Sequence, residues 1–324
     1  MQNIRFKNTT LLITLKDQAE FSKKLIKFLN SQKILINIFI ADGSKKSQKN
    51  LFKKLKHRFN YFYYGEDKNL VDYYLKIFLS LKKIKTDFIF FCDQDDFINF
   101  SCLKKKENFL INNKQYSAAK GLIYNFTVFK RSFILGDRTY IKEIKNKKSL
   151  FKRLFTNLHF RSYYCLHRKK NLLKIYRLIT KYKLSDTRTA EFTMDIMTLL
   201  KGQIFLINSC SLLRWMGNKY DIHPVKRHEQ TRLVWFFKKI MKNKTLLEEI
   251  RLSNKSLRIN TFLFTCIIFI IDVFPVAFKR SFTIFIRIFF KITKFFKTKH
   301  LDFIYFNIYE VNKIFKTIND RSNQ

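Results

Sequence analysis

The sequence predicts an α/β fold in which a mostly parallel sheet carries helices on both faces. Along the first hundred residues, short apolar runs alternate with segments whose apolar residues have helical spacing. The apolar runs are nearly continuous, which is typical of parallel strands buried on both faces. Acidic residues follow two of these runs, and ligands of such sheets bind beyond the carboxyl ends of the strands.

The expected elements follow this alternation in order. We expect strands at 11–15, 34–42, 60–65 and 87–93. The helices between them are expected at 17–31, 47–58 and 70–84. Further along we expect a helix at 101–113, a turn and strand at 116–129, a helix at 191–202 that ends at Gly202, and a strand at 203–209. The basic stretch from the end of the strand at 116–129 to about residue 170 has no clear period.

The chain is strongly basic, with 65 Lys and Arg against 24 Asp and Glu among 324 residues. A basic surface can bind polyphosphate by releasing counterions. AT-rich codons offer another explanation, because they encode the abundant Lys, Asn, Ile and Phe. The lysines are also spread along the chain. The charge therefore indicates anionic partners in general, a phosphate-bearing substrate or an acidic membrane surface included.

The five cysteines are widely spaced and form no C-x-x-C pair. This pattern fits neither a disulfide framework nor a zinc site, and it suggests a reducing compartment. The apolar stretch at 11–15 is shorter than the ~7–15 residues of a signal-peptide core. We therefore expect a cytoplasmic protein.

An acidic cluster follows the apolar run at 87–92. Asp93, Asp95 and Asp96 occupy three of four consecutive positions, where like charges repel one another. Hard divalent cations such as Mg²⁺ or Mn²⁺ take carboxylate oxygens, and Mg²⁺ is usually held by one or two carboxylates plus substrate phosphates. The alternative is an Asx-turn or a helix cap, which one Asp would satisfy. Three carboxylates favour a metal that bridges to a diphosphate.

Three motifs stand in order along the chain: ITLKDQAEF (13–21), IADGS (40–44) and CDQDDF (92–97). In order and spacing they resemble the GT-A fold of the family-two inverting glycosyltransferases, and in particular a bacterial subgroup with Ala-Asp-x-Ser and Asp-x-Asp-Asp-Phe motifs. The resemblance covers about residues 10–215. It implies a Rossmann-like GT-A domain that binds a nucleotide-sugar donor and a divalent cation.

The resemblance also implies roles for individual residues. Asp42 would contact the nucleotide base or ribose. Asp93 would bind the ribose or lie at the metal, Asp95 would ligate the metal, and Asp96 would support the site. The family carries its catalytic base eleven residues before the Gly that ends a later helix. Counting back from Gly202 gives Glu191.

A base is what the chemistry requires, since a carboxylate must take the proton of the attacking acceptor hydroxyl. Glu191 has two rivals in Asp186 and Asp195. The alternative is that Glu191 has a structural role only, because the helix dipole favours Glu in the first turn of a helix.

Two later features are open to two interpretations each. Arg214 and Trp215 resemble the Arg-Trp of processive synthases, but Ser211 replaces the Gln that precedes it there. Arg214 could reach a diphosphate and Trp215 a sugar, although a basic–aromatic pair after a strand is more often packing. His223 could be a third metal ligand, although a lone His near a Pro is more often structural.

The chain departs from the family pattern elsewhere. The usual first-strand Pro is absent, and no Asn-x-Gly or Ala-Arg-Asn can be recognised in KNLVDYYLKI (68–77). The acid pair before the helix is reduced to Ala190-Glu191. These departures keep an inactive, transferase-like protein among the alternatives.

We expect a GT-A domain at 8–225 and a basic, Phe/Ile-rich helical region at 226–324. The run at 259–278 is nearly long enough to span a bilayer at ~20 residues, and 279–300 interleaves Phe and Ile with Lys and Arg. Peripheral contact with an anionic membrane ranks first, packed helices second and a true span third. That places the protein at the inner face of the cell membrane.

The sequence thus favours a metal-dependent inverting glycosyltransferase that uses a nucleotide-sugar donor and a glycan or lipid-linked acceptor in cell-envelope polysaccharide synthesis. A non-enzymatic nucleic-acid-binding protein would give the acidic cluster no role, so no nucleic acid is expected. No Gly-rich phosphate loop, Ser-x-Gly elbow or close His/Cys spacing is present, which excludes P-loop, hydrolase and zinc enzymes.

Overall fold

The computed structural model describes residues 3–129, 132–138 and 161–215. The helical region expected at 226–324, the run at 259–278 and His223 lie outside the described residues. Within the described part of the chain, no helix is long and apolar enough to cross a membrane.

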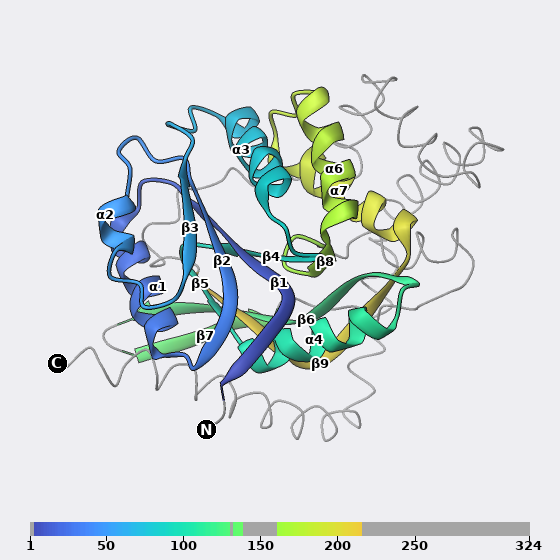
Figure 1. Cartoon of the computed structure of the whole chain (residues 1–324), viewed down its shortest axis with the longest axis horizontal. Helices are drawn as coiled ribbons and strands as arrows, with labels where there is room; N and C mark the ends of the chain where they lie inside the picture. Colours follow the sequence, from blue (N-terminus) through green and yellow to red (C-terminus); the bar gives the residue numbers. More distant parts are fainter. Residues whose placement is uncertain (1–2, 130–131, 139–160, 216–324) are drawn as a thin grey trace, which may run out of the picture. The chain divides into compact units, whose positions relative to one another are not determined.

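The described chain alternates between strands and helices and forms a single sheet flanked by helices (Figure 1). The strands are β1 (Ile4–Leu15), β2 (Ile34–Asp42), β3 (Phe59–Tyr63), β4 (Phe88–Asp93), β5 (Asp96–Ile98), β6 (Tyr116–Phe129), β7 (Ser132–Arg138), β8 (Leu166–Arg168) and β9 (Gln203–Trp215). The helices are α1 (Ala19–Ser31), α2 (Lys49–Phe52), α3 (Leu70–Lys83), α4 (Phe100–Asn112), α6 (Lys169–Lys181) and α7 (Thr187–Lys201). The α/β class is therefore confirmed.

The first half of the sheet is parallel and has the order β3-β2-β1-β4. β4 shows why its strands read as continuous apolar runs. Phe90 faces the core that includes residues of α1 and α4, whereas the ring of Phe91 packs against Tyr176 of α6 with centroids 5.8 Å apart. Both faces of the strand are buried, so neither can carry polar residues.

The second half of the sheet is mixed and continues as β8-β6-β9-β5, with β7 paired to β6. β6 and β9 are parallel, while β8 runs antiparallel to β4 and to β6. The short strand β5 pairs antiparallel with β9 and places Asp96 opposite Arg214. The end of β9 therefore lies beside the loop that carries the acidic cluster.

Several expectations about elements were incomplete. β1 begins at Ile4 and not at residue 11, and β9 continues to Trp215 and not to residue 209. The helix expected at 47–58 is only four residues long. The chain after it turns, with a bond from Leu55 N to Phe52 O at 2.9 Å, and the side chain of Asn30 donates to Lys54 O at 2.8 Å and accepts from Lys56 N at 2.7 Å. The basic stretch before residue 170 contains the start of α6, which no pattern predicted.

Candidate active site at the carboxyl edge of the sheet

Asp42 is the last residue of β2 and Asp93 is the last residue of β4, and both lie at the same edge of the sheet. In the strand register, Leu15 of β1 pairs with Asp42 on one side, and Thr14 pairs with Asp93 on the other. β1 therefore lies between them, and the two aspartates are two strand spacings apart, about 10 Å. The parallel register therefore brings together two aspartates that lie about fifty residues apart in the sequence.

The carboxylate of Asp93 accepts three hydrogen bonds from hydroxyl groups. Thr14 Oγ1 donates to Oδ1 at 2.7 Å, and Tyr163 OH donates to the same oxygen at 3.0 Å. Tyr164 OH donates to Oδ2 at 3.2 Å. Asp93 is thus held in one orientation by groups from β1 and from the segment before β8.

Asp95 and Asp96 are held less well. Burial, followed by the charge of Asp93, raises the pKa of Asp95 to about 6. Asp96 is fully buried; its Oδ2 accepts a bond from Asp93 N at 3.0 Å, whereas its Oδ1 has no partner among the described residues. Burial, followed by the charges of Asp93 and Asp95, raises its pKa well above the usual value. For both carboxyl groups, burial and like charge outweigh the attraction of Arg214, so the ionised forms are destabilised.

Arg214 is the cation placed against this cluster. It lies across from Asp96 in the β5–β9 pairing, and its guanidinium carbon is 5.7 Å from the centre of the Tyr164 ring. Burial acts to lower the pKa of Arg214, but Tyr164 and the nearby Asp96 outweigh it, so the pKa is raised. The side chain remains exposed, which leaves it able to meet an anion.

The donor set suits a hard divalent cation. The oxygens of Asp93 and Asp95 and the partnerless oxygen of Asp96 are of the type that Mg²⁺ and Mn²⁺ take. Among the residues with assigned positions, no three His, Cys, Asp or Glu side chains are arranged to hold a metal by themselves. The residues therefore fit a cation whose remaining ligands come from a substrate phosphate.

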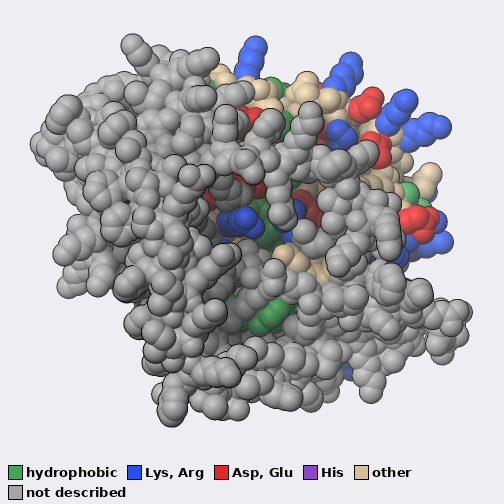
Figure 2. All heavy atoms as spheres, turned by 180° about the vertical axis from the view of Figure 1, so that it is seen from behind, with side chains coloured by type: hydrophobic (Ala, Val, Ile, Leu, Met, Phe, Trp, Pro, Cys, Tyr) green, Lys and Arg blue, Asp and Glu red, His purple; other side chains and the backbone are tan. Residues whose placement is uncertain are grey.

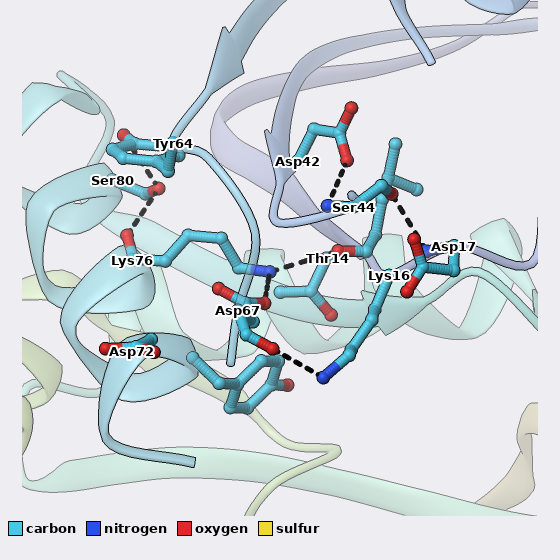
Figure 3. A network of polar contacts seen from close by, with 12 residues as sticks. Thr14, Lys16, Asp17, Asp42, Ser44, Tyr64, Asp67, Asp72, Lys76 and Ser80 are labelled. Atoms are coloured by element: carbon cyan, nitrogen blue, oxygen red, sulfur yellow. Dashed lines mark hydrogen bonds and ion pairs between the residues drawn. The ribbon is translucent and has the colours of Figure 1, made fainter. Parts of the chain in front are cut away.

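Asp42 is saturated by its own loop. Its Oδ1 accepts a bond from Ser44 N at 2.9 Å (Figure 3). Its Oδ2 accepts one from Gln48 N at 2.9 Å. Tyr61 OH donates a further short bond to Oδ2. Asp42 is fully buried, and the bonds fix the turn between β2 and α2.

Next to Asp42 lies a buried ion pair that sequence reasoning did not find. Lys76 of α3 donates a short bond to Asp67 and a bond of 3.0 Å to Leu15 O, at the end of β1 (Figure 3). Both side chains are almost fully buried. Burial lowers the pKa of Lys76 and raises that of Asp67, in each case against the attraction of the partner. Lys76 lies in the segment where the Ala-Arg-Asn of the family could not be recognised.

The loops at this edge are tied to one another through Gln94. Its side-chain oxygen accepts a bond from Lys16 N at 2.8 Å, and its amide nitrogen donates to Gln18 O at 3.0 Å. Asp17, between them, has a left-handed φ of 56°, a conformation that Asp tolerates better than most residues. The acidic loop and the loop after β1 therefore form one unit.

The three candidate bases on α7 differ in what they contact. Asp186 caps the helix by accepting a bond from Thr189 N at 2.8 Å. Asp195 is buried, and both of its oxygens accept bonds from residues 161 and 162. Glu191 is half-buried in the second turn, because α7 begins at Thr187 and not at Glu191 as expected.

Glu191 and Asp93 share an electrostatic neighbour. Burial is the main cause of the raised pKa of Tyr176, and the charges of Asp93 and Glu191 both add to it. Tyr74 likewise has a pKa raised mainly by burial and next by Glu191. Tyr176 of α6 therefore senses the charge of both carboxylates, one at the end of β4 and one on α7.

The tyrosines at 163 and 164 were also missed, because they lie in the stretch without a clear period. The sequence did hold one indication, since RSYYC places two aromatic residues with hydroxyl groups next to each other before a short apolar run. Only the fold reveals that both phenols reach Asp93.

Comparison with known proteins gives a fold likeness alone. No protein-family model matches the chain, and neither does any curated protein. Solved structures of S. aureus TarS are similar. TarS 1–349 has a TM-score of 0.44 and 16% identity, with 64% of this chain and 60% of that chain covered. TarS 1–349 in complex with UDP-GlcNAc has a TM-score of 0.46 and 16% identity, with 76% and 66% covered. Because the scores are below 0.5, the residues of the site must carry the functional interpretation.

Proposed function

We propose that this chain is a metal-dependent inverting glycosyltransferase, which moves a sugar from a nucleotide-sugar donor to a glycan or lipid-linked acceptor in cell-envelope polysaccharide synthesis. The observation that carries the proposal is the acidic loop. Asp93, Asp95 and Asp96 lie at the carboxyl edge of the sheet, one oxygen of Asp96 has no partner among the described residues, and the exposed Arg214 lies opposite Asp96. This is the arrangement that a metal and a diphosphate would complete.

Asp95 and Asp93 would hold Mg²⁺ or Mn²⁺, and Asp96 would support them from beneath. When bound, the cation offsets the charge of the departing nucleoside diphosphate as a Lewis acid. Arg214 would meet the same diphosphate from β9. Asp93 would contact the nucleoside. Asp42 is fully buried and hydrogen-bonded, so it would act on the nucleoside through the loop after β2 that it holds in place.

Glu191 would act as the base. The acceptor oxygen attacks the anomeric carbon from the side opposite the diphosphate, so one C–O bond forms while the bond to phosphate breaks. The hydroxyl proton passes to the Glu191 carboxylate, which needs to lie within hydrogen-bond reach of that hydroxyl. Asp186 caps α7 and Asp195 binds the backbone of residues 161 and 162, so each of these two aspartates already has a structural role.

The nucleic-acid alternative has less support. A protein that binds polyphosphate along one face concentrates basic side chains there. In the face seen in Figure 2, the Lys and Arg side chains of the described residues are interspersed with Asp and Glu. Three carboxylates at the sheet edge would also repel phosphate unless a metal intervened. We propose peripheral contact with the inner face of an anionic membrane for the remainder of the chain.

Calorimetry with Mn²⁺ and either UDP or GDP tests the donor site. We expect wild type to bind one of them only with metal, and Asp95→Asn to lose that binding by a factor of about 100 or more, as expected for loss of a charged metal ligand. Asp87→Asn is a matched control, because Asp87 is exposed at the other end of β4 and should change nothing. Binding of neither nucleotide, with salt-sensitive binding of RNA instead, would overturn the proposal.

Glu191→Gln tests the base separately. It should keep nucleotide binding while transfer to the acceptor falls by about 10²–10⁴-fold, the usual contribution of general base catalysis. Equal activity in the variant would exclude Glu191 as the base.

A further inference from the structure

A tight turn supplies both phenols that bind Asp93. Cys165 N donates to Ser162 O at 2.9 Å, which closes a four-residue turn with Tyr163 and Tyr164 at its two central positions. Tyr163 stacks on Phe91 with centroids 4.9 Å apart, and its hydroxyl group also bonds that of Tyr73 at 2.7 Å. The orientation of Asp93 therefore depends on where this turn sits.

The start of the turn is fixed by Asp195 of α7. Oδ1 of Asp195 accepts bonds from Ser162 N at 2.6 Å and Ser162 Oγ at 2.7 Å, and Oδ2 accepts a bond from Arg161 N at 3.1 Å. Asp195 is 4% exposed and Ser162 is fully buried, so water does not compete for these bonds. A carboxylate that takes up two successive backbone N–H groups holds that backbone much as it would hold a helix end.

Two further buried side chains hold the carbonyl groups of the same residues. Lys120 Nζ donates to Arg161 O at 3.1 Å, and His167 Nε2 donates to Ser162 O at 2.7 Å. Burial lowers the pKa of His167 to about 4, so its ring is neutral at physiological pH and the proton sits on Nε2, because a carbonyl oxygen only accepts. Arg161 has a left-handed φ of 50°, a conformation unfavourable for a side chain of its size. Such a conformation persists only where the surroundings impose it.

We infer that Asp195 is a positioning residue, which acts through the turn 162–165 to orient the carboxylate of Asp93. This inference rests on the proposed function, since it assigns the purpose of the arrangement to donor binding. It assigns Asp195 a role other than that of a base. It also means that α7, which carries Glu191, and the loop that carries Asp93 are joined by one continuous set of hydrogen bonds.

The coupling is tested by a cycle of variants. Tyr163→Phe/Tyr164→Phe removes both phenol hydroxyls, and we expect it to weaken Mn²⁺-dependent binding of UDP or GDP about tenfold with little change in melting temperature. Asp195→Asn should weaken the same binding by a similar factor. If Asp195 acts through the tyrosines, adding Asp195→Asn to the tyrosine variant should cost little more. Fully multiplicative losses would overturn the inference.

Two controls match these changes. Thr198→Val alters a buried hydroxyl group one turn further along α7 that has no partner among the described residues, and Tyr116→Phe removes a phenol at the opposite end of the sheet. Both should leave nucleotide affinity unchanged. If Asp195→Asn does not fold, Ser162→Ala replaces it, because it removes one bond to Asp195 and leaves the carboxylate in place.

Hydrogen exchange separates this inference from the proposed function. The amides of Arg161 and Ser162 should exchange at least tenfold faster in Asp195→Asn than in Thr198→Val, whether or not any nucleotide binds. Unchanged protection would sink the inference even if donor binding is confirmed. Faster exchange in a protein that binds no nucleotide would confirm that Asp195 holds the turn at 162–165 and would contradict the proposed transferase function.

Discussion

The two acidic clusters at the edge of this sheet differ in what satisfies their carboxylates. Around Asp42 and Asp67, every bond is made by the protein itself: backbone N–H groups, Tyr61 and the buried Lys76. Around Asp95 and Asp96, one carboxyl oxygen lacks any partner among the described residues, and the largest charge acting on each carboxyl group is the like charge of Asp93. The comparison teaches that the first cluster builds the edge and the second is left for a ligand.

The largest effect on stability should come from breaking the closed cluster. Lys76→Met leaves Asp67 buried without its counter-ion, which should lower the free energy of unfolding by about 3–5 kcal/mol. Urea unfolding at pH 7 measures the change. Lys76→Met/Asp67→Asn should recover most of the loss, since no uncompensated charge remains. A loss below about 1 kcal/mol in the single variant would mean that the ion pair is not closed to water.

A second change tests how tightly the closed cluster is packed. The methyl carbon of Gly43→Ala would lie 2.0 Å from Asp67 Oδ2, so Asp67 must move and weaken its bond to Lys76. We expect a loss of about 1–3 kcal/mol in the free energy of unfolding. In an Asp67→Ala background the same substitution should cost much less. Equal costs in the two backgrounds would contradict the packing argument.

The open cluster should reveal itself through pH. The folded-state pKa of Asp95 is raised to about 6 from 3.8, so ionisation is harder in the folded state than in the unfolded one. The metal-free protein should therefore lose up to about 3 kcal/mol of stability as the pH rises from about 4 to about 6, and nothing from this group below that window. Asp96 acts in the same direction.

Melting curves across this range, with and without Mn²⁺, measure the effect. Asp95→Asn should flatten the pH dependence, and Mn²⁺ should restore stability at pH 7 in wild type alone. Stability that instead rises between pH 4 and 6, with Asp95→Asn flattening the rise, would show that a cation of the protein already satisfies Asp95.

The smallest effect should come from Tyr61→Phe, which removes one of three donors to Asp42. We expect a loss of about 1 kcal/mol, because two backbone donors remain. Tyr63→Phe is the matched control: its exposed hydroxyl group bonds Lys45 O at 3.1 Å, and its loss should change stability by less than about 0.5 kcal/mol. Nucleotide binding by both variants should match wild type.

The sequence was sufficient for what depends on local pattern. Apolar runs and helical spacing predicted the strands up to β4, and the end of β4 placed the acidic loop at the ligand-binding edge. The role of Asp42 as a loop-forming residue could not be predicted, because its donors include Tyr61 on another strand. Lys76 could not be paired with Asp67 either, since helical periodicity alone would place Lys76 among the solvent-facing lysines. The turn at 162–165 depends on contacts with β6, β8 and α7, which no local window contains.

The register of β1 has a consequence for which molecules can bind. Leu15 pairs with Asp42 and Thr14 with Asp93, so the separation between the two aspartates is set by backbone hydrogen bonds and not by side chains. If the nucleoside lies at one and the diphosphate at the other, the sheet itself acts as a ruler of about 10 Å. Loop substitutions could then change which base or sugar is accepted, while a ligand too short to span two strand spacings, such as a sugar monophosphate, would fail to engage both ends.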